Sequence, residues 1–397
     1  MAITQYDEGT MFVPIRSGDI CPICGNKDGR CSEFYLNHEL LFIACKHETS
    51  LDPMVNLPGW YKHYVNGKRG GYNSYNRQTN NTIKKRIKST KTKKITHEVI
   101  DLRHRVYEDL RALICDKIDG GLYEEDKKDL IRRGLSDEEI KRMGFFSVPK
   151  SSHRVYGDSN YKIQLSTYIS RKLYEKYGEE LLRVAGFIKI NGNDKDDYIT
   201  FKTKMKNPET DKLEDIRGYF IPYHNINGQF VGMQYRLSKP VLDDKGKPIR
   251  YFWFSSKNAS SGSPIDYYEP SNIKRKDILL VGEGALKMKI ASEKLGYRSL
   301  AEAGVTNYRN LVKNIQLLSK KENRKINIIL ALDMDKYENV NIVNNRKFYP
   351  ILDAERKTIK LLKKAGFKVA IAEWDKDKGK GIDDALQNGA RLDYKLV

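Results

Sequence analysis

The sequence predicts a multidomain α/β protein whose C-terminal part is a parallel sheet covered by helices. From about residue 276, apolar strand-like segments alternate with amphipathic helical segments, and this alternation is typical of parallel sheets. Four of the five cysteines fall between Cys21 and Cys45, which indicates a small metal-stabilised module at the N-terminus. The length of 397 residues is enough for two or three domains.

The chain carries a formal net charge of +20, which indicates a polyanionic partner, most simply nucleic acid. A membrane surface is the other polyanion, but the sequence has neither a long apolar segment nor an amphipathic anchor. The N-terminal residues lack the basic start and apolar core of a secretory signal. We therefore expect a cytoplasmic protein with reduced thiols and no membrane partner.

The N-terminal cysteine cluster begins with Cys21-Pro-Ile-Cys24-Gly, a knuckle whose tight turn directs two thiolates at one tetrahedral zinc ion. Cys31 and Cys45 complete a set of four thiolates, which is the ligand set we favour. A set that uses His47 with one of these two cysteines is the alternative. Structural zinc would stabilise a module too small to fold on its own core.

A basic segment, residues 66–98, follows this N-terminal module, which we assign to residues 1–65. The segment is rich in Asn, Thr, Gly and Lys, and no acidic residue occurs between Asp52 and Glu98. Such a composition buries little apolar surface and predicts a flexible linker. Its cations, with Tyr72 and Tyr75, could also contact a phosphate backbone, and the two interpretations are compatible.

The region 99–275 is predicted to be a mixed α and β subdomain. Apolar residues at helical spacing predict a helix over 99–118. Ser136 followed by Glu139 has the spacing of a capping box and predicts the start of another helix. Two strands are expected on either side of an Asn-Gly turn at Asn227.

The last region, 276–397, contains the predicted parallel sheet. Strands are expected over residues 277–284, 325–335 and 368–375, and helices over residues 285–296 and 355–366.

Acidic side chains follow two of these strands at the end where parallel sheets bind ligands. Glu283 ends one strand, and Asp333 and Asp335 end the other. Residues two apart in an extended segment point the same way, so the two aspartates can share a target. Mg²⁺ or Mn²⁺ would offset their repulsion, and Gly284 lets a phosphate approach the backbone.

These motifs resemble those of the Toprim domain, which is found in DnaG-type primases, topoisomerases and some nucleases. The matching residues are Glu283-Gly284, Gly304, and Asp333-Met334-Asp335. The resemblance implies that Glu283 is a metal ligand or general base and that the aspartates hold the metal. It also implies that Asp383, in "KGKGIDDALQNG", belongs to the magnesium site.

One residue departs from the primase pattern. Bacterial primases usually have an acid in the helix after Glu-Gly, where this chain has Lys287. A lysine there could pair with the acids or contact a phosphate, so we include it among the catalytic candidates.

The region upstream is similar to that of DnaG-type primases. The segments "LIRRGLSDEEIKRMGFFSVP", "RGYFIPYHNINGQFVGMQYRLS" and "RYFWFSSKNAS" occur in the same order as in those enzymes. The resemblance implies that template and nucleotide phosphates contact a face lined by Arg217, Arg236, Arg250 and Lys257. The cysteine module resembles the primase zinc ribbon, which is implied to read the template.

The expected function is that of a phage- or plasmid-type DNA primase. It would synthesise short RNA primers on single-stranded DNA from nucleoside triphosphates, with Mg²⁺ or Mn²⁺ at the acids and Zn²⁺ in the ribbon. The sequence has no GxxxxGK[ST] motif, so the replicative helicase is expected to be a separate protein in the bacterial host cytoplasm. The alternatives are a Toprim nuclease that uses the same acids, and a non-catalytic DNA-binding replication factor.

Overall fold

The structure is a computed structural model that describes residues 4–6, 10–15, 19–26, 28–36, 39–47, 54, 60–64, 96–157, 161–190, 197–206, 212–242, 246, 248–338, 340–343 and 346–397. Most of the predicted linker, 66–98, therefore lies outside the described residues. The chain forms two compact units, one of Met1–Lys94 with Ile342–Lys347, and the other of Ile95–Asn341 with Phe348–Val397. Each unit is described by itself.

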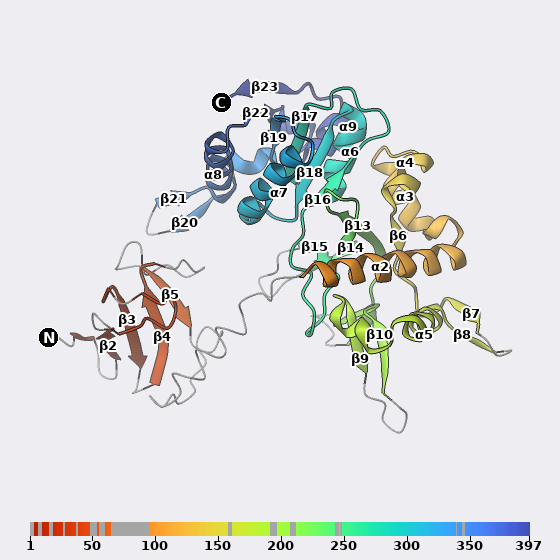
Figure 1. Cartoon of the computed structure of the whole chain (residues 1–397), viewed down its shortest axis with the longest axis horizontal. Helices are drawn as coiled ribbons and strands as arrows, with labels where there is room; N and C mark the ends of the chain where they lie inside the picture. The colour runs from red at the N-terminus through yellow and green to blue at the C-terminus, as the bar shows by residue number, and fades with distance from the viewer. Residues whose placement is uncertain are drawn as a thin grey trace. The chain divides into compact units, whose positions relative to one another are not determined.

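The first unit is a five-stranded antiparallel sheet in the order β1-β2-β3-β4-β5 (Figure 1). Cys31 begins one central strand and Cys45 ends its neighbour, and the two residues are paired in the register. Among the described residues of this unit, one buried cluster consists of three cysteines and Ile43, and Leu40, Phe42 and Ala44 are buried as well. The strands are β1 (Thr4–Tyr6), β2 (Thr10–Pro14), β3 (Cys31–Leu36), β4 (Glu39–Cys45) and β5 (Tyr61–Tyr64).

The second unit begins with three helices, α2 (His97–Lys117), α3 (Glu124–Arg132) and α4 (Asp137–Met143). The predicted capping box is confirmed: the Ser136 hydroxyl accepts from Glu139 N, and the Glu139 carboxylate accepts from Ser136 N. The short helix η2 (Asp119–Gly121) connects α2 to α3.

A four-stranded antiparallel sheet, in the order β15-β14-β13-β6, packs on α2 and α5. Its central hairpin turns at Asn225–Gln229, and Gly228 adopts a φ of 75°, as the predicted Asn-Gly turn requires. The elements are β6 (Phe146–Ser147), α5 (Leu165–Tyr177), η3 (Gly178–Arg183), β13 (Gly218–His224), β14 (Phe230–Leu242) and β15 (Pro248–Trp253). Three small hairpins accompany it: β7 (Arg154–Tyr156) with β8 (Lys162–Gln164), β9 (Phe187–Ile190) with β10 (Tyr198–Phe201), and β11 (Lys204–Lys206) with β12 (Leu213–Asp215).

The predicted parallel sheet is confirmed as a six-stranded sheet in the order β16-β18-β17-β19-β22-β23. Its four inner strands are parallel, and the two edge strands are antiparallel to them. The strands are β16 (Asp266–Tyr268), β17 (Ile278–Glu283), β18 (Arg298–Glu302), β19 (Asn327–Ala331), β22 (Lys368–Glu373) and β23 (Asp393–Leu396). Because β17 leads to β18 on one side and β19 leads to β22 on the other, the topological switch point lies between β17 and β19.

Helices cover both faces of this sheet, which explains why its inner strands are largely apolar. Helices α6 (Ala285–Leu295) and α9 (Ile382–Gln387) lie on one face, and α7 (Tyr308–Lys321) and α8 (Pro350–Lys364) on the other (Figure 1). The first face also packs on α3, α4 and β13, so the sheet and the region upstream share one core. The remaining elements are η4 (Val305–Asn307), η5 (Met334–Tyr337), β20 (Asn341–Val343), β21 (Arg346–Phe348) and η6 (Lys376–Lys378).

No helix within the described ranges is both long enough and apolar enough to cross a lipid bilayer.

Candidate functional site

Four acidic residues, Glu283, Glu302, Asp333 and Asp335, lie where three parallel strands of the six-stranded sheet end. Glu283 is the last residue of β17 and is paired in the register with Glu302, the last residue of β18. On the other side, Gly282 is paired with Ala331, two residues before Asp333. The switch point thus separates Glu283 from the two aspartates. All three lie at the carboxyl ends of the strands, where open parallel sheets bind ligands.

Glycines on either side of Glu283 allow this close approach. A Cβ atom on Gly282 would lie 2.5 Å from the carbonyl oxygen of Ala331, so only glycine lets the two strands approach at this point. Gly284 adopts a φ of 84° and donates its N–H to the Glu302 carbonyl at 2.7 Å. This left-handed conformation, which glycine adopts without strain, turns the chain directly into α6.

Two lysines contact the aspartates. Lys287, in the first turn of α6, donates from Nζ to Asp333 Oδ1 at 2.6 Å. Lys380 Nζ lies 2.8 Å from Asp335 Oδ2 and 3.6 Å from Asp333 Oδ2. The backbone places Lys380 here, because its carbonyl accepts from Met334 N at 3.0 Å.

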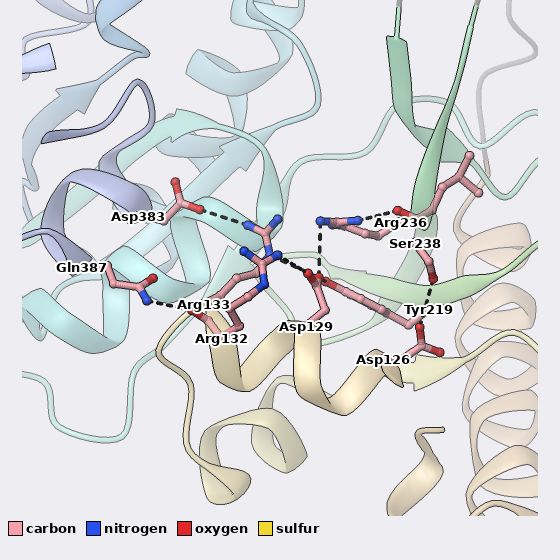
Figure 2. A network of polar contacts seen from close by, with 10 residues as sticks. Asp126, Asp129, Arg132, Arg133, Tyr219, Arg236, Ser238, Asp383 and Gln387 are labelled. Carbon is pink, nitrogen blue, oxygen red and sulfur yellow. Dashed lines mark hydrogen bonds and ion pairs between the residues drawn. The ribbon is translucent and has the colours of Figure 1, made fainter. Parts of the chain in front are cut away.

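Asp383 is also close to this group. It lies in the first turn of α9, is only 4% exposed, and faces Arg133 Nη1 at 3.6 Å. Figure 2 shows Arg133 reaching Asp383 on one side and Asp129 on the other, where its Nε is 3.3 Å from the carboxylate. A Cβ on Gly381 would lie 2.6 Å from Asp383 Oδ1 and 3.7 Å from Asp333 Oδ1, so both carboxylates lie next to that glycine.

Several carboxylate oxygens in this group are buried without a donor. Within the described ranges, no hydrogen-bond partner reaches Asp335 Oδ1, Asp383 Oδ1 or Glu302 Oε2. A buried acceptor without a partner costs about 1–3 kcal/mol, and more when it is charged. A cation with oxygen ligands would remove this cost at the aspartates.

The pKa shifts describe the same excess of negative charge. Burial raises the pKa of Glu283, and the charges of Asp333 and Asp335 add to the rise while Lys287 and Lys380 oppose it. The pKa of Glu302 rises to about 8, first because it is buried and then because Glu283 is near. Glu302 therefore holds a proton at neutral pH, and the two lysines leave the other acids incompletely neutralised.

The acids suit a hard divalent cation by their chemistry, but within the described residues only Cys21, Cys24, Cys31 and Cys45 gather their ligand atoms as a group that could hold a metal ion. The possible ligand atoms are all carboxylate oxygens, which Mg²⁺ and Mn²⁺ prefer. Asp335 and Asp383 each have one oxygen that accepts no hydrogen bond within the described ranges. Glu283, Asp333 and Asp335 would hold such an ion, with Asp383 beside them. A metal ion at these acids would share them with the ammonium groups of Lys287 and Lys380.

The basic residues predicted to contact phosphates have different environments. Arg217, Arg250 and Lys257 are exposed. Arg236 is only 1% exposed: it packs between the rings of Tyr219 and Tyr251, and its Nη2 is 3.4 Å from Asp129 Oδ2 (Figure 2). Its guanidinium is thus part of an internal polar network that also holds Arg133.

A cavity of about 370 Å³ opens beside that network. Its cationic lining consists of Arg132, Arg133 and Lys378, while Asp377 and Asp384 are its acids. The Gln387 side chain also donates to the Arg132 carbonyl at 2.7 Å, which joins α9 to the end of α3. The cavity is therefore a polar pocket with guanidinium groups next to the acidic cluster.

Sequence reasoning missed Glu302, Lys380 and Arg133. Glu302 follows an apolar strand just as Glu283 does, so the strand-end rule could have found it. Arg133 and Lys380 stand in helix-turn and Gly-Lys-Gly segments that carry no sequence signal for a contact with distant acids.

The four cysteines of the first unit gather at one point. Their sulfur atoms all lie within 4.8 Å of one another, with Cys24 Sγ 3.8 Å from Cys31 Sγ and the latter 3.5 Å from Cys45 Sγ. Four tetrahedral Zn–S bonds of about 2.3 Å place sulfurs about 3.8 Å apart, so the set suits a structural zinc ion. The knuckle turns at Gly25, whose N–H donates to the Cys21 carbonyl at 2.9 Å.

His47 is outside this group. Its Nε2 lies 2.7 Å from Asp28 Oδ2, so the all-cysteine set is the one that the structure brings together. Burial raises the pKa of the Cys21 thiol to about 11, and a bound metal ion would be needed to keep it as a thiolate at neutral pH.

Comparisons with known proteins give a family match and several structural likenesses. Residues 272–391 match a family model described as "Domain of unknown function (DUF3854)". No curated protein sequence matches the chain.

Structures similar to this chain include a DnaG primase catalytic domain bound to ssDNA, at 14% identity over 74% of this chain and 77% of that one, with a TM-score of 0.46. The zinc-binding and RNA polymerase domains of Aquifex aeolicus primase are 16% identical over 79% of this chain and 64% of that one, with a TM-score of 0.45. The RNA polymerase domain of Mycobacterium tuberculosis DnaG is 14% identical over 68% and 76%, with a TM-score of 0.41.

Proposed function

We propose that this protein is a DNA primase that joins ribonucleotides on single-stranded DNA by metal-dependent nucleotidyl transfer, in phage- or plasmid-type replication. The observation that carries the proposal is the group of carboxylates at the ends of β17 and β19, on either side of the switch point, together with Asp335 Oδ1, a buried oxygen that no donor reaches within the described residues. The Toprim-like motifs found in the sequence fall on these same residues.

The residues around the group suit the proposed reaction. Glu283, Asp333 and Asp335 would hold Mg²⁺ or Mn²⁺, which when bound would neutralise phosphate charge and favour attack by a 3′-hydroxyl. Arg132 and Arg133 line the adjoining cavity, where their guanidinium groups can bind phosphate oxygens. Exposed Arg217, Arg250 and Lys257 would contact the template backbone. The zinc module, which we place at residues 1–65, would hold template or the first nucleotides, with 66–98 as its tether.

A priming assay tests this proposal. Wild-type protein with ssDNA of random sequence, labelled nucleoside triphosphates and Mg²⁺ or Mn²⁺ is expected to yield short RNA. Asp333→Asn and Glu283→Gln remove a negative charge at constant size, and each should lower synthesis by about a hundredfold or more. DNA binding by both variants should stay near that of wild type.

Asp353→Asn is the matched control, because Asp353 forms an exposed ion pair with Lys357 on α8, away from the acidic group. It should prime as wild type does. Wild-type rates from Asp333→Asn would eliminate the site, and cleavage of the labelled DNA in place of synthesis would identify a nuclease.

A second candidate function is a non-catalytic DNA-binding replication factor, and the 2.6 Å contact between Lys287 and Asp333 favours it. In this case the lysines neutralise the acids permanently and no metal is required. Such a factor would bind DNA with strong salt dependence, with a log–log slope of about −0.7 per phosphate contacted on single strands. It would show no turnover with any divalent metal.

A further inference from the structure

Strand β23 forms one edge of the six-stranded sheet, next to β22 (Figure 1). All four of its residues are exposed, and its two large apolar side chains are open to water: Tyr394 is 48% exposed and Leu396 is 76% exposed. No strand pairs with the outer side of β23 among the described residues. An edge strand of this kind presents unpaired backbone groups to which another strand can add.

The hydrogen bonds of β23 show which of its backbone groups are available. Val397 donates its N–H to the Val369 carbonyl at 3.1 Å, and the register continues with Lys395 opposite Ile371. Because bonded and non-bonded pairs alternate along an antiparallel ladder, the odd-numbered residues of β23 exchange hydrogen bonds with β22. The N–H and C=O groups of Tyr394 and Leu396 therefore point away from the sheet.

The charged side chains of β23 alternate with its apolar ones. Asp393 and Lys395 are two residues apart, so they lie on the same face of the strand, and both are exposed. Neither forms an ion pair within the described ranges. Asp393 instead lies directly opposite Glu373 of β22, where like charges repel. The strand thus carries an acid and a base that a second strand could pair.

A second copy of β23 fits this pattern in one register. In an antiparallel pair related by a two-fold axis, outward-facing residues oppose one another. With the axis at Tyr394, Asp393 of each copy lies opposite Lys395 of the partner subunit, and Leu396 lies opposite Leu392 of the partner subunit. Moving the axis by one residue would place Asp393 opposite Asp393 or Lys395 opposite Lys395. Charges usually protect edge strands from pairing, but in this one register they attract.

We propose that β23 is a dimerisation surface, on which a second copy of this chain pairs antiparallel about a two-fold axis at Tyr394. The two six-stranded sheets then become one continuous sheet. Two ion pairs between Asp393 and Lys395, two apolar contacts between Leu392 and Leu396, and the pair of Tyr394 side chains hold the copies together. The inference uses none of the acids at the strand ends, so it is independent of the proposed function.

Charge reversal tests this register. Sedimentation velocity of the full chain with zinc bound, over a series of concentrations, should show a reversible dimer in the micromolar range. Asp393→Lys places cations opposite cations, and Lys395→Asp places acids opposite acids. Each variant should therefore dimerise about tenfold more weakly or worse. Because both side chains are exposed, both variants should fold as wild type does.

A mixture of the two variants gives a comparison that a general loss of stability cannot imitate. The cationic edge of Asp393→Lys then faces the acidic edge of Lys395→Asp, and dimers should form with about the wild-type affinity. Glu138→Lys and Lys313→Asp are the matched controls, because they make the same changes of charge at exposed positions of α4 and α7. Each control should dimerise as wild type does.

A cross-link locates the two-fold axis. Residues of a bonded antiparallel pair have Cα atoms about 5.5 Å apart, which is within the range of a disulfide. Tyr394→Cys should therefore form a disulfide between two copies under mild oxidation, and peptide mass spectrometry identifies it. Leu396→Cys should not link to itself, because its two copies would lie four residues apart along the strands, about 14 Å.

Three results would overturn the inference. The first is a wild-type chain that stays monomeric at every concentration. The second is a dimer that neither charge reversal weakens, because it would use another surface. The third is an equimolar mixture of the two variants that stays monomeric. Nucleotidyl transfer is measured separately in the priming assay, so each of these results leaves the proposed function intact.

Discussion

A buried ion pair joins the six-stranded sheet to the region that precedes it in the chain. Lys289 of α6 and Asp266 of β16 are each only 1% exposed, and their Nζ and Oδ2 atoms are 2.6 Å apart. Lys289 also donates to the Pro222 carbonyl at 2.9 Å, and Asp266 Oδ1 accepts from His224 N at 2.9 Å. One ion pair thus links α6, β16 and β13, and neither charge has access to water.

Lys289→Met is expected to destabilise the protein by about 3–5 kcal/mol, because it leaves the Asp266 carboxylate buried without its partner. Urea denaturation followed by circular dichroism measures the change. In the double variant Lys289→Met/Asp266→Asn much of the loss should be recovered, since no unpaired charge remains. A loss of under 1 kcal/mol in the single variant would show that water reaches the pair.

His224 makes stability depend on pH. Burial, which is the largest cause, and the nearby charges of Lys289, Arg111 and His104 together lower the pKa of its imidazole from 6.5 to about 3. In the unfolded chain, His224 therefore binds a proton below about pH 6.5. In the folded protein it binds this proton only at about pH 3. The contribution to stability is complete above the unfolded pKa and is lost as the pH falls through this interval.

Unfolding free energies of wild type and His224→Gln should therefore diverge by about 1.4 kcal/mol per pH unit as the pH is lowered from 6.5 towards 3. Denaturant midpoints at several pH values give the comparison, and the glutamine variant is the reference because it does not titrate. Parallel curves for the two proteins would contradict the buried neutral imidazole.

At the scale of elements, the spacing between β17 and β19 determines where the acids meet. Gly282 permits this spacing, because a Cβ would lie 2.5 Å from the Ala331 carbonyl and 2.6 Å from Met288 Sδ. Gly304, in the loop after β18, has no atom within 4 Å of its Cβ position and an ordinary extended backbone. Gly282 and Gly304 thus have different structural roles.

Gly282→Ala should cost about 1–3 kcal/mol by overpacking, and should weaken Mn²⁺ binding because it displaces β17 next to Glu283. Gly304→Ala, the matched control, should change neither property measurably. Thermal unfolding and Mn²⁺ titration of the two variants provide the test, and equal effects would refute the role given to the strand spacing.

At the scale of the whole molecule, the two units depend on different forces. The second unit has three extensive hydrophobic clusters, while the first has a small cluster made mainly of cysteines. The four clustered cysteines are consistent with a structural zinc ion, which would add to the stability of the first unit.

Removal of zinc by a chelator should unfold the first unit and leave the second intact. Cys45→Ser should lose bound zinc and become sensitive to trypsin within its N-terminal residues, whereas Cys115→Ser, whose residue lies on α2 outside the cluster, should keep both properties. Bound zinc and the tryptic pattern are the measurements. Zinc retained by Cys45→Ser would contradict the four-cysteine set.

The sequence by itself determined several elements of the parallel sheet. The apolar segments 277–284, 325–335 and 368–375 predicted β17, β19 and β22, but β19 ends at Ala331 and Asp335 lies in η5 instead of in the extended segment that was expected. The knuckle at Cys21 and Cys24 predicted the cysteine cluster in the same way. These features are local, because periodicity and turn chemistry depend on residues close together in the chain.

Only the tertiary structure decided which charges meet. It brought Lys287 and Lys380 to the aspartates and Arg133 to Asp383, and it buried Arg236 against Asp129. Whether an ion pair forms depends on the distance between packed elements and on how deeply the two side chains are buried. The spacing of residues along the chain predicts neither quantity.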